Sequence, residues 1–174
     1  MIPHMSIFEL IDADDLEGVR RLIAADPAAA EARDDQGLSP IVHATYRGRT
    51  AIAAALPPLD GWDRLLRGES DGLPAPAAWS PDGFTALHIA AFADNAQAAR
   101  RLLEQGADPN AVARSSFARV TPLGTCAFAG ANGVARVLVE HGADPGIAEA
   151  DGGTPIDVAR ANANDELVAL LSGR

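Results

Sequence analysis

Apolar residues recur at helical spacing along the chain, and each group follows a residue that is suited to start a helix. A hydroxyl residue precedes four of these groups, and in three of them a proline comes next. The hydroxyl can accept a hydrogen bond from the free amides of the first turn, where a proline loses nothing by lacking an N–H. The pattern therefore predicts short helices that begin after Ser39, Thr85, Thr121 and Thr154.

A second helix is predicted to follow each of the helices that begin after Thr85 and Thr121. Apolar residues from Ala98 to Leu103 share one face, and we expect Asp94 and Gln97 to cap that helix. Val134 to Val139 form the equivalent face in the next copy. Gly106 and Gly142 follow these helices, at the place where a left-handed residue commonly ends a helix.

Both ends of the chain have helical patterns of their own, whereas residues 57–79 interrupt the order. Residues 6–25 predict two capping helices, the second beginning at Asp14, and a final helix is predicted from Asn164. In the interruption, Pro57-Pro58 stops a helix, and residues 62–66 predict one short helix before an exposed loop.

The pattern repeats in phase. The four hydroxyl residues are 46, 36 and 33 positions apart, and Gly106 and Gly142 are also 36 apart. The recurring segments are Ser39-Pro40-Ile41-Val42, Thr85-Ala86-Leu87-His88, Thr121-Pro122-Leu123-Gly124 and Thr154-Pro155-Ile156-Asp157. They resemble the ankyrin repeat, which has a period of about 33 residues and a T-P-L-H-x-A core. The resemblance covers residues 34–171, and a degenerate cap extends it to Ser6.

The resemblance implies an all-α repeat solenoid, in which helix-turn-helix pairs are joined by β-hairpin-like loops. We expect a single domain over residues 1–174. Its parts are an N-terminal cap (6–33), a repeat (34–58), a degenerate or shortened repeat (59–79), a repeat (80–112), a repeat with a longer hairpin (113–148) and a C-terminal capping repeat (149–174).

Composition agrees with thin helical layers. The 174 residues include 37 alanines but only five Phe, two Trp and one Tyr, too few large side chains to fill one thick core easily. The net charge of −10 argues against a nucleic-acid partner, because phosphate binding needs a basic face. No apolar run approaches the roughly 20 residues of a membrane span, and from residues 1–10 we expect no secretory signal. We therefore expect a cytoplasmic protein without membrane contact that is monomeric alone.

The resemblance also implies a structural role for one histidine. His88 occupies the histidine position of the T-P-L-H segment, which bridges neighbouring hairpins in the family. Val42, Gly124 and Asp157 stand at that position in the other copies, so we expect those bridging hydrogen bonds to be incomplete. The only cysteine, Cys126, excludes a disulfide framework and is expected to be buried.

Partner contacts in the family come from the hairpin tips and from the exposed face of each first helix. Carried over position by position, these contacts fall on Asp35, Gln36, Leu38, Tyr46, Arg47, Asp82, Phe84, Phe92, Phe117 and Phe128. We add Trp79, which immediately precedes a hairpin, and Arg114 and Arg119 in the hairpin that is three residues longer.

Aromatic residues are concentrated in this set, which is typical of interaction surfaces. The alternative is that Tyr46, Phe92 and Phe128 only pack against neighbouring helices or hairpins. The two arginines could meet an acidic patch on a partner, or they could simply remain solvated.

The favoured function is a non-catalytic module that binds an unidentified protein partner through its concave face and hairpin tips. A regulatory or inhibitory subunit of a cytosolic enzyme is the second hypothesis. A metal-dependent hydrolase is a remote third, because the interruption contains Asp60, Asp63, Glu69 and Asp71 but no His or Cys. The sequence shows no known catalytic motif, and we expect no enzyme activity, cofactor or bound metal.

Overall fold

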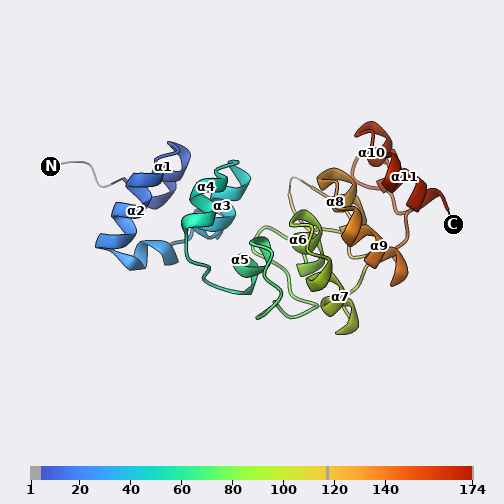
Figure 1. Ribbon diagram of the computed structural model, residues 1–174, viewed down its shortest axis with the longest axis horizontal. Coiled ribbons are helices and arrows are strands. Elements are labelled where there is room, and N and C mark those ends of the chain that lie inside the picture. The colour runs from blue at the N-terminus through green and yellow to red at the C-terminus, as the bar shows by residue number, and fades with distance from the viewer. Residues whose placement is uncertain (1–4, 117, 174) are drawn as a thin grey trace. The chain divides into compact units, whose positions relative to one another are not determined.

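The computed structural model describes residues 5–116 and 118–173, and every regular element within these residues is a helix. The chain divides into two compact units, Met1–Asp63 and Arg64–Arg174. Figure 1 labels the helices of each. Of the helices in the described residues, none is both long enough and apolar enough to cross a membrane.

The first unit contains two helix pairs. Its elements are α1 (Ile7–Asp12), α2 (Leu16–Ala25), a 3₁₀ turn η1 (Pro27–Glu31), α3 (Pro40–Tyr46) and α4 (Thr50–Ala55). Helix α1 packs on α3 and α2 packs on α4, so equivalent helices of successive pairs lie together. The short helix α5 (Gly61–Leu66) begins in this unit and ends in the next.

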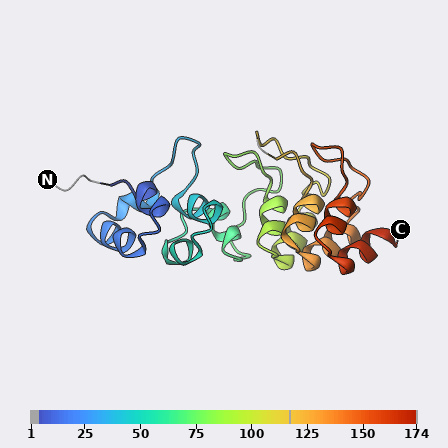
Figure 2. The ribbon, with the colours of Figure 1, turned by 90° about the horizontal axis from the view of Figure 1, so that it is seen from above.

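The second unit contains three helix pairs. They are α6 (Ala86–Phe92) with α7 (Ala96–Glu104), α8 (Pro122–Ala129) with α9 (Asn132–Glu140), and α10 (Pro155–Ala161) with α11 (Asp165–Ser172). The first helices α6, α8 and α10 pack in one row and the second helices in another. Figure 2 shows that the loops that precede the first helices project from the same side of this unit. This arrangement, repeated in each unit, is that of an all-α repeat solenoid.

Small residues make the contacts between helices close. In α6, the side chains of Ala86, Ala90 and Ala91 are fully buried, with Leu87 beside them. Each layer holds few large side chains, so the high alanine content serves the packing of thin layers, as the composition predicts.

The predicted helix starts are confirmed. Ser39 accepts a hydrogen bond from the Val42 amide, and Thr121 accepts one from the Gly124 amide at 3.0 Å. Thr85 and Thr154 form reciprocal capping boxes with the third helical residue, His88 and Asp157 respectively.

Two predicted caps are wrong by one residue. Helix α2 is capped by Asp15 and α7 by Asn95, rather than by Asp14 and Asp94. The backbone of Asp14 (φ 58°) and Asp94 (φ 48°) is left-handed, so each residue forms the turn between paired helices and leaves the cap to the next residue. Asn164 caps the last helix as predicted.

The interruption contains α5, as predicted, but part of the expected exposed loop is tied to α7. The Asn95 side-chain amide donates to the Glu69 carbonyl at 3.0 Å. Arg101 donates to the Ser70 carbonyl at 2.7 Å and forms an ion pair with Asp71 at 2.8 Å. This segment therefore lies against the second helix of the following pair.

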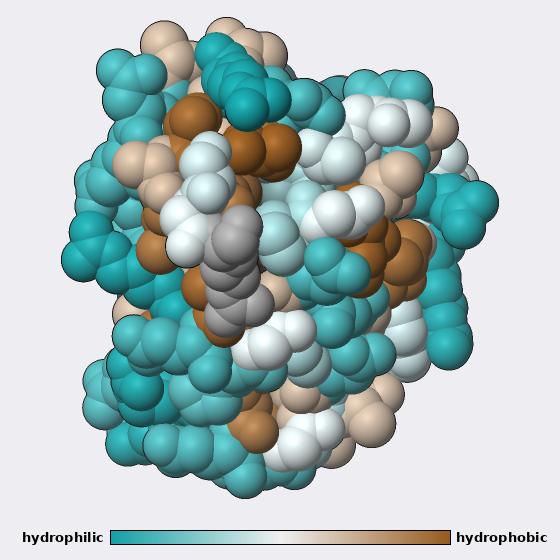
Figure 3. Space-filling view, turned by 90° about the vertical axis from the view of Figure 1, so that its right-hand side faces the viewer, coloured by the Kyte–Doolittle hydropathy of each residue, from teal (hydrophilic) through white to brown (hydrophobic). Residues whose placement is uncertain are grey.

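The right-hand side of the molecule, at the C-terminal end of the second unit, mixes hydrophilic and hydrophobic surface (Figure 3). The outermost helix, α11, buries Leu167 and Leu171 and exposes Asp165 and Glu166. A polar outer face of this kind is what the terminal repeat of a solenoid needs.

Candidate functional site

Three aromatic side chains are exposed at the same position of three first helices. Tyr46, Phe92 and Phe128 each follow the N-cap residue of their helix by seven positions. The side chain of Phe128 is 73% exposed, and those of Tyr46 and Phe92 are 40% exposed. The aliphatic residues earlier in these helices, such as Ile41, Leu87 and Leu123, are buried, so the rings are not part of the core.

Phe92 and Phe128 lie on helices that pack directly against each other, α6 and α8. The corresponding residue of α10 is Ala161, which is also exposed. The second unit thus presents two aromatic rings and a small residue at equivalent places on consecutive helices. Tyr46 occupies the equivalent place in the first unit.

Two residues of the predicted contact set are buried, so they offer little surface to a partner. Leu38 is 5% exposed and Phe84 is 8% exposed. Each directly precedes a helix N-cap, where an apolar side chain commonly folds back onto the first turn. Phe84 packs edge-on against the ring of His88, with 5.7 Å between ring centroids.

The hairpin residues Asp35 and Gln36 are exposed as predicted, and Asp82 is half-buried. The neighbouring Asp34 orders the first hairpin, because its Oδ1 accepts from the amides of Gln36 and Leu38, both at 2.9 Å. In the second unit, the Ser80 hydroxyl donates to Asp82 at 2.5 Å. Asp35 and Asp82 therefore lie in turns whose conformation is stabilised by hydrogen bonds.

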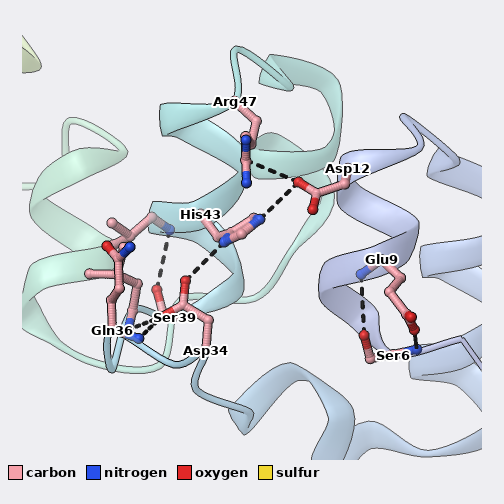
Figure 4. A network of polar contacts seen from close by, with 10 residues as sticks. Ser6, Glu9, Asp12, Asp34, Gln36, Ser39, His43 and Arg47 are labelled. Atoms are coloured by element: carbon pink, nitrogen blue, oxygen red, sulfur yellow. Dashed lines mark hydrogen bonds and ion pairs between the residues drawn. The ribbon is translucent and has the colours of Figure 1, made fainter.

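Arg47 belongs to a polar network around His43 (Figure 4). The two ring nitrogens of His43 lie 2.9 Å from Asp34 Oδ2 and 3.0 Å from Asp12 Oδ1, and Arg47 Nε lies 3.0 Å from the same Asp12 oxygen. Burial alone would raise the pKa of Asp34, but hydrogen bonds from His43 and two backbone amides outweigh it and lower that pKa. The network joins the end of α1 to α3 and to the first hairpin.

The other candidate arginines, Arg114 and Arg119, lie on the third hairpin, which residues 113–120 form. The guanidinium of Arg114 stands over the ring of the half-buried Trp79, 4.0 Å from its centroid, in a cation–π contact. Arg119 is exposed. Phe117, the remaining candidate of this hairpin, lies outside the described residues.

His88 bridges successive repeats as the resemblance implies. Its Nδ1 accepts from the Thr85 amide at 3.2 Å, and its Nε2 lies 3.0 Å from the carbonyl oxygen of Val120 in the next hairpin. A carbonyl can only accept, so Nε2 carries the proton. Burial lowers the pKa of His88 to about 4, although the bond to Val120 offsets part of this effect. The ring is therefore neutral at pH 7.

The other repeats lack the histidine bridge, but in two of them acidic side chains from later in the chain make a bond to the cap residue instead. At Thr121, the amide and hydroxyl donate to Glu149 Oε1 at 3.4 and 3.3 Å. At Ser39, the hydroxyl donates to the buried carboxylate of Asp63, which also accepts from the Leu59 amide at 3.0 Å. Burial raises the pKa of both acids, and their hydrogen bonds offset only part of the increase.

These two acids were missed by sequence reasoning. Glu149 could have been found from the sequence, because Gly124 leaves the histidine position of its repeat empty and the next hairpin carries a carboxylate. Asp63 gives a weaker signal, since it lies in the irregular segment where no repeat register assigns it a partner.

Neither the cysteine nor the acidic and histidine side chains of the described residues form a reactive or metal-binding group. Cys126 is fully buried, and burial raises the pKa of its thiol, which keeps it protonated and unreactive. Within residues 5–116 and 118–173, no group of three or more His, Cys, Asp or Glu is placed to hold a metal ion. Around His43, for example, the two carboxylates lie at opposite ring nitrogens and do not converge on a common point.

A family model described as ankyrin repeats (3 copies) matches residues 7–113, more than half of the chain. The chain belongs to the ankyrin-repeat family. The match begins at the first residue of α1, so the capping pair α1 and α2 counts as part of the ankyrin array. Beyond residue 113, α8 to α11 continue the ankyrin pattern of paired helices. A comparison with curated proteins finds no match.

Ankyrin repeats are generic protein–protein interaction modules, and domains built from them are typically non-catalytic. The aromatic residues at the ends of the first helices and several charged residues of the hairpins are exposed on the surface of this ankyrin array.

Proposed function

We propose that this protein is a non-catalytic binding module that recognises a partner protein through the exposed ends of its first helices and its hairpins. The observation that carries the proposal is the exposure of Phe92 and Phe128 at the same position of adjacent helices. Aromatic side chains supply a large part of the binding energy in protein interfaces. Exposed in pairs, they provide apolar surface that a partner can cover.

The test is capture of partners from the native cytosol on the immobilised full-length protein, compared with a Phe92→Ala/Phe128→Ala variant. We expect the variant to lose binding by about 2 kcal/mol or more, the range typical of interface hot spots. Phe128 is 73% exposed and Phe92 is 40% exposed, so the melting temperature of the variant should fall only modestly below that of the parent.

Met5→Ala provides the matched control, because Met5 is an exposed apolar side chain (42%) away from the first-helix positions. Partner capture that survives the double substitution, or that falls equally with the control, would contradict the proposal.

A further inference from the structure

The third hairpin is tied to the hairpins on both sides of it by backbone hydrogen bonds. The Arg114 amide donates to the carbonyl of Gly83 at 2.8 Å, and the Ala150 amide donates to the carbonyl of Arg119 at 3.1 Å. At Gly83 (φ 87°), a Cβ would lie 2.7 Å from the Arg114 backbone, so only glycine permits this approach. Three consecutive hairpins are thereby held in a row.

The same bonds give the register of this hairpin. The Ala113 amide donates to the Val120 carbonyl at 2.8 Å, which places residue 113 across from residue 120 where the chain folds back. Continued by one residue, this register places Arg114 across from Arg119. Their backbone groups are turned outward, to the neighbouring hairpins.

Burial agrees with this register. Ala113 is buried and Arg114 and Arg119 are both exposed, so both guanidinium groups reach solvent from the same short hairpin. Like charges held on one short hairpin repel each other.

Nothing in the described residues neutralises the two charges. Neither Arg114 nor Arg119 is within ion-pair distance of a carboxylate there, whereas most arginines of the described chain are. The paired ones are Arg20, Arg21, Arg33, Arg47, Arg49, Arg64, Arg100, Arg101, Arg136 and Arg160. Adjacent unpaired cations are unusual on a chain with a net charge of −10.

We propose that Arg114 and Arg119 form a carboxylate-binding site that receives acidic side chains from a segment of the partner protein. This inference rests on the proposed binding function and specifies its partner. The planar guanidinium fork matches a carboxylate in bidentate geometry, and stacking on Trp79 already holds Arg114 in place. A partner carboxylate also relieves the repulsion between the two arginines.

A protein segment fits this site better than a nucleic acid does. Polyphosphate backbones are bound by extended basic surfaces, whereas the hairpins on either side of this one carry acids, Asp82 and Asp151. The site is therefore suited to one or two carboxylates and repels a long polyanion.

The test is an NMR titration of the full-length protein with tetraglutamate, acetylated at its N-terminus and amidated at its C-terminus. We expect saturable shifts of the Nε–Hε signals of Arg114 and Arg119 and of the Trp79 indole signal, which weaken as salt is added. An Arg114→Gln/Arg119→Gln variant should bind about fivefold or more weakly, as expected for solvent-accessible charge pairs. Tetraglutamine should produce no such shifts.

Arg136→Gln/Arg160→Gln is the matched control, because it removes the same charge from two exposed arginines of the same unit. Equal weakening by both variants, absence of saturable shifts, or tighter binding of an oligothymidylate would each overturn the inference. The Phe92→Ala/Phe128→Ala variant should bind tetraglutamate like the parent. Failure of this titration, together with partner capture that depends on the two phenylalanines, would refute the carboxylate site and leave the binding function standing.

Discussion

The carboxylate of Glu149 fills the space beside Gly124 that any longer side chain at residue 124 would need. It also accepts the amide and hydroxyl hydrogens of Thr121, the cap of the same helix. In the preceding repeat, His88 stands at the position of Gly124 and holds its own cap residue, Thr85. In α8, Glu149 of the following hairpin thus binds the cap residue, a role that His88 of the helix itself has in α6.

This exchange predicts that the effect of Gly124→His depends on residue 149. With Glu149 present, the histidine collides with the carboxylate and the substitution should lower the free energy of unfolding by about 1–3 kcal/mol. In a Glu149→Ala background, the histidine can take the role of His88 and the same substitution should raise stability. Urea unfolding of the two single variants and the double variant measures both effects.

Glu149→Ala alone should cost about 1–2 kcal/mol, because the Thr121 hydroxyl and amide lose their acceptor. The control is Glu140→Ala, which removes an exposed acid from α9. The outcome that contradicts this role for Glu149 is additivity of Gly124→His and Glu149→Ala. In that case Gly124→His would lower stability both with and without Glu149.

His88 makes the second unit sensitive to acid. Its pKa is about 4 in the folded protein and 6.5 when unfolded, so the folded state binds fewer protons between these values. The stability that the neutral ring contributes is fully present above pH 6.5 and is lost as pH falls toward 4. At pH 5 the loss should be about 2 kcal/mol relative to pH 7.

The measurement is denaturant unfolding at pH 7 and pH 5, with His88→Asn as reference. Asp63 and Glu149, whose pKa values are raised, change stability in the opposite direction between these pH values, and both remain in the reference. The difference between parent and variant therefore isolates the histidine. An equal response to pH in both proteins would contradict the assignment.

The two serine caps of the first unit should differ in importance. Ser6 is an exposed cap that shares a capping box with Glu9, so Ser6→Ala should cost about 1 kcal/mol. Ser39 is buried and donates to the buried carboxylate of Asp63. Ser39→Ala should cost about 2–4 kcal/mol, because it removes the cap and leaves the buried carboxyl group of Asp63 with one donor fewer. Thermal unfolding of the two variants makes the comparison, and equal costs would contradict a stabilising bond from Ser39 to Asp63.

The turns between paired helices offer a stabilising substitution. Ala163 has a left-handed backbone (φ 53°), at the place where Gly130 (φ 74°) forms the preceding turn. Replacement of Ala163 by glycine should raise the free energy of unfolding by about 1 kcal/mol, because it removes the steric cost of the Cβ.

Gly130→Ala, where a Cβ would meet nothing within 4 Å, should lower that free energy by a similar amount through backbone strain alone. Calorimetry of both variants tests the pair. A gain from alanine at residue 130 would show that the left-handed backbone there carries no cost for a side chain.

Local signals in the sequence were sufficient for the helix pairs. Hydroxyl residues at the caps and apolar residues at helical spacing act within one helix, and the structure confirms Ser39, Thr85, Thr121 and Thr154 as caps. The cap of α7 was misplaced because Asp94 and Asn95 are both good caps, and the left-handed turn at Asp94 decides between them.

Contacts between distant residues were harder to predict. Leu38 and Phe84 match surface positions of the family, yet their apolar side chains fold under the hairpins. The pairing of Ser39 with Asp63 joins residues 24 positions apart across an irregular segment, for which no periodic signal exists. The exposure of Phe92 and Phe128, by comparison, agrees with the exposed helix position that the family resemblance assigns to them.

The bonds that Asp63 and Glu149 make with earlier caps give the chain an order of completion during synthesis. The first turn of α6 closes with a histidine made three residues after its cap, so it is finished almost as soon as it is made. The first turn of α8 is likewise capped from within, since Thr121 accepts from the Gly124 amide, but the Thr121 hydroxyl gains its own acceptor only when Glu149 has been made, 28 residues later. A nascent chain that ends between these residues therefore lacks the acceptor for that hydroxyl, and the arrival of the last hairpin completes the repeat before it.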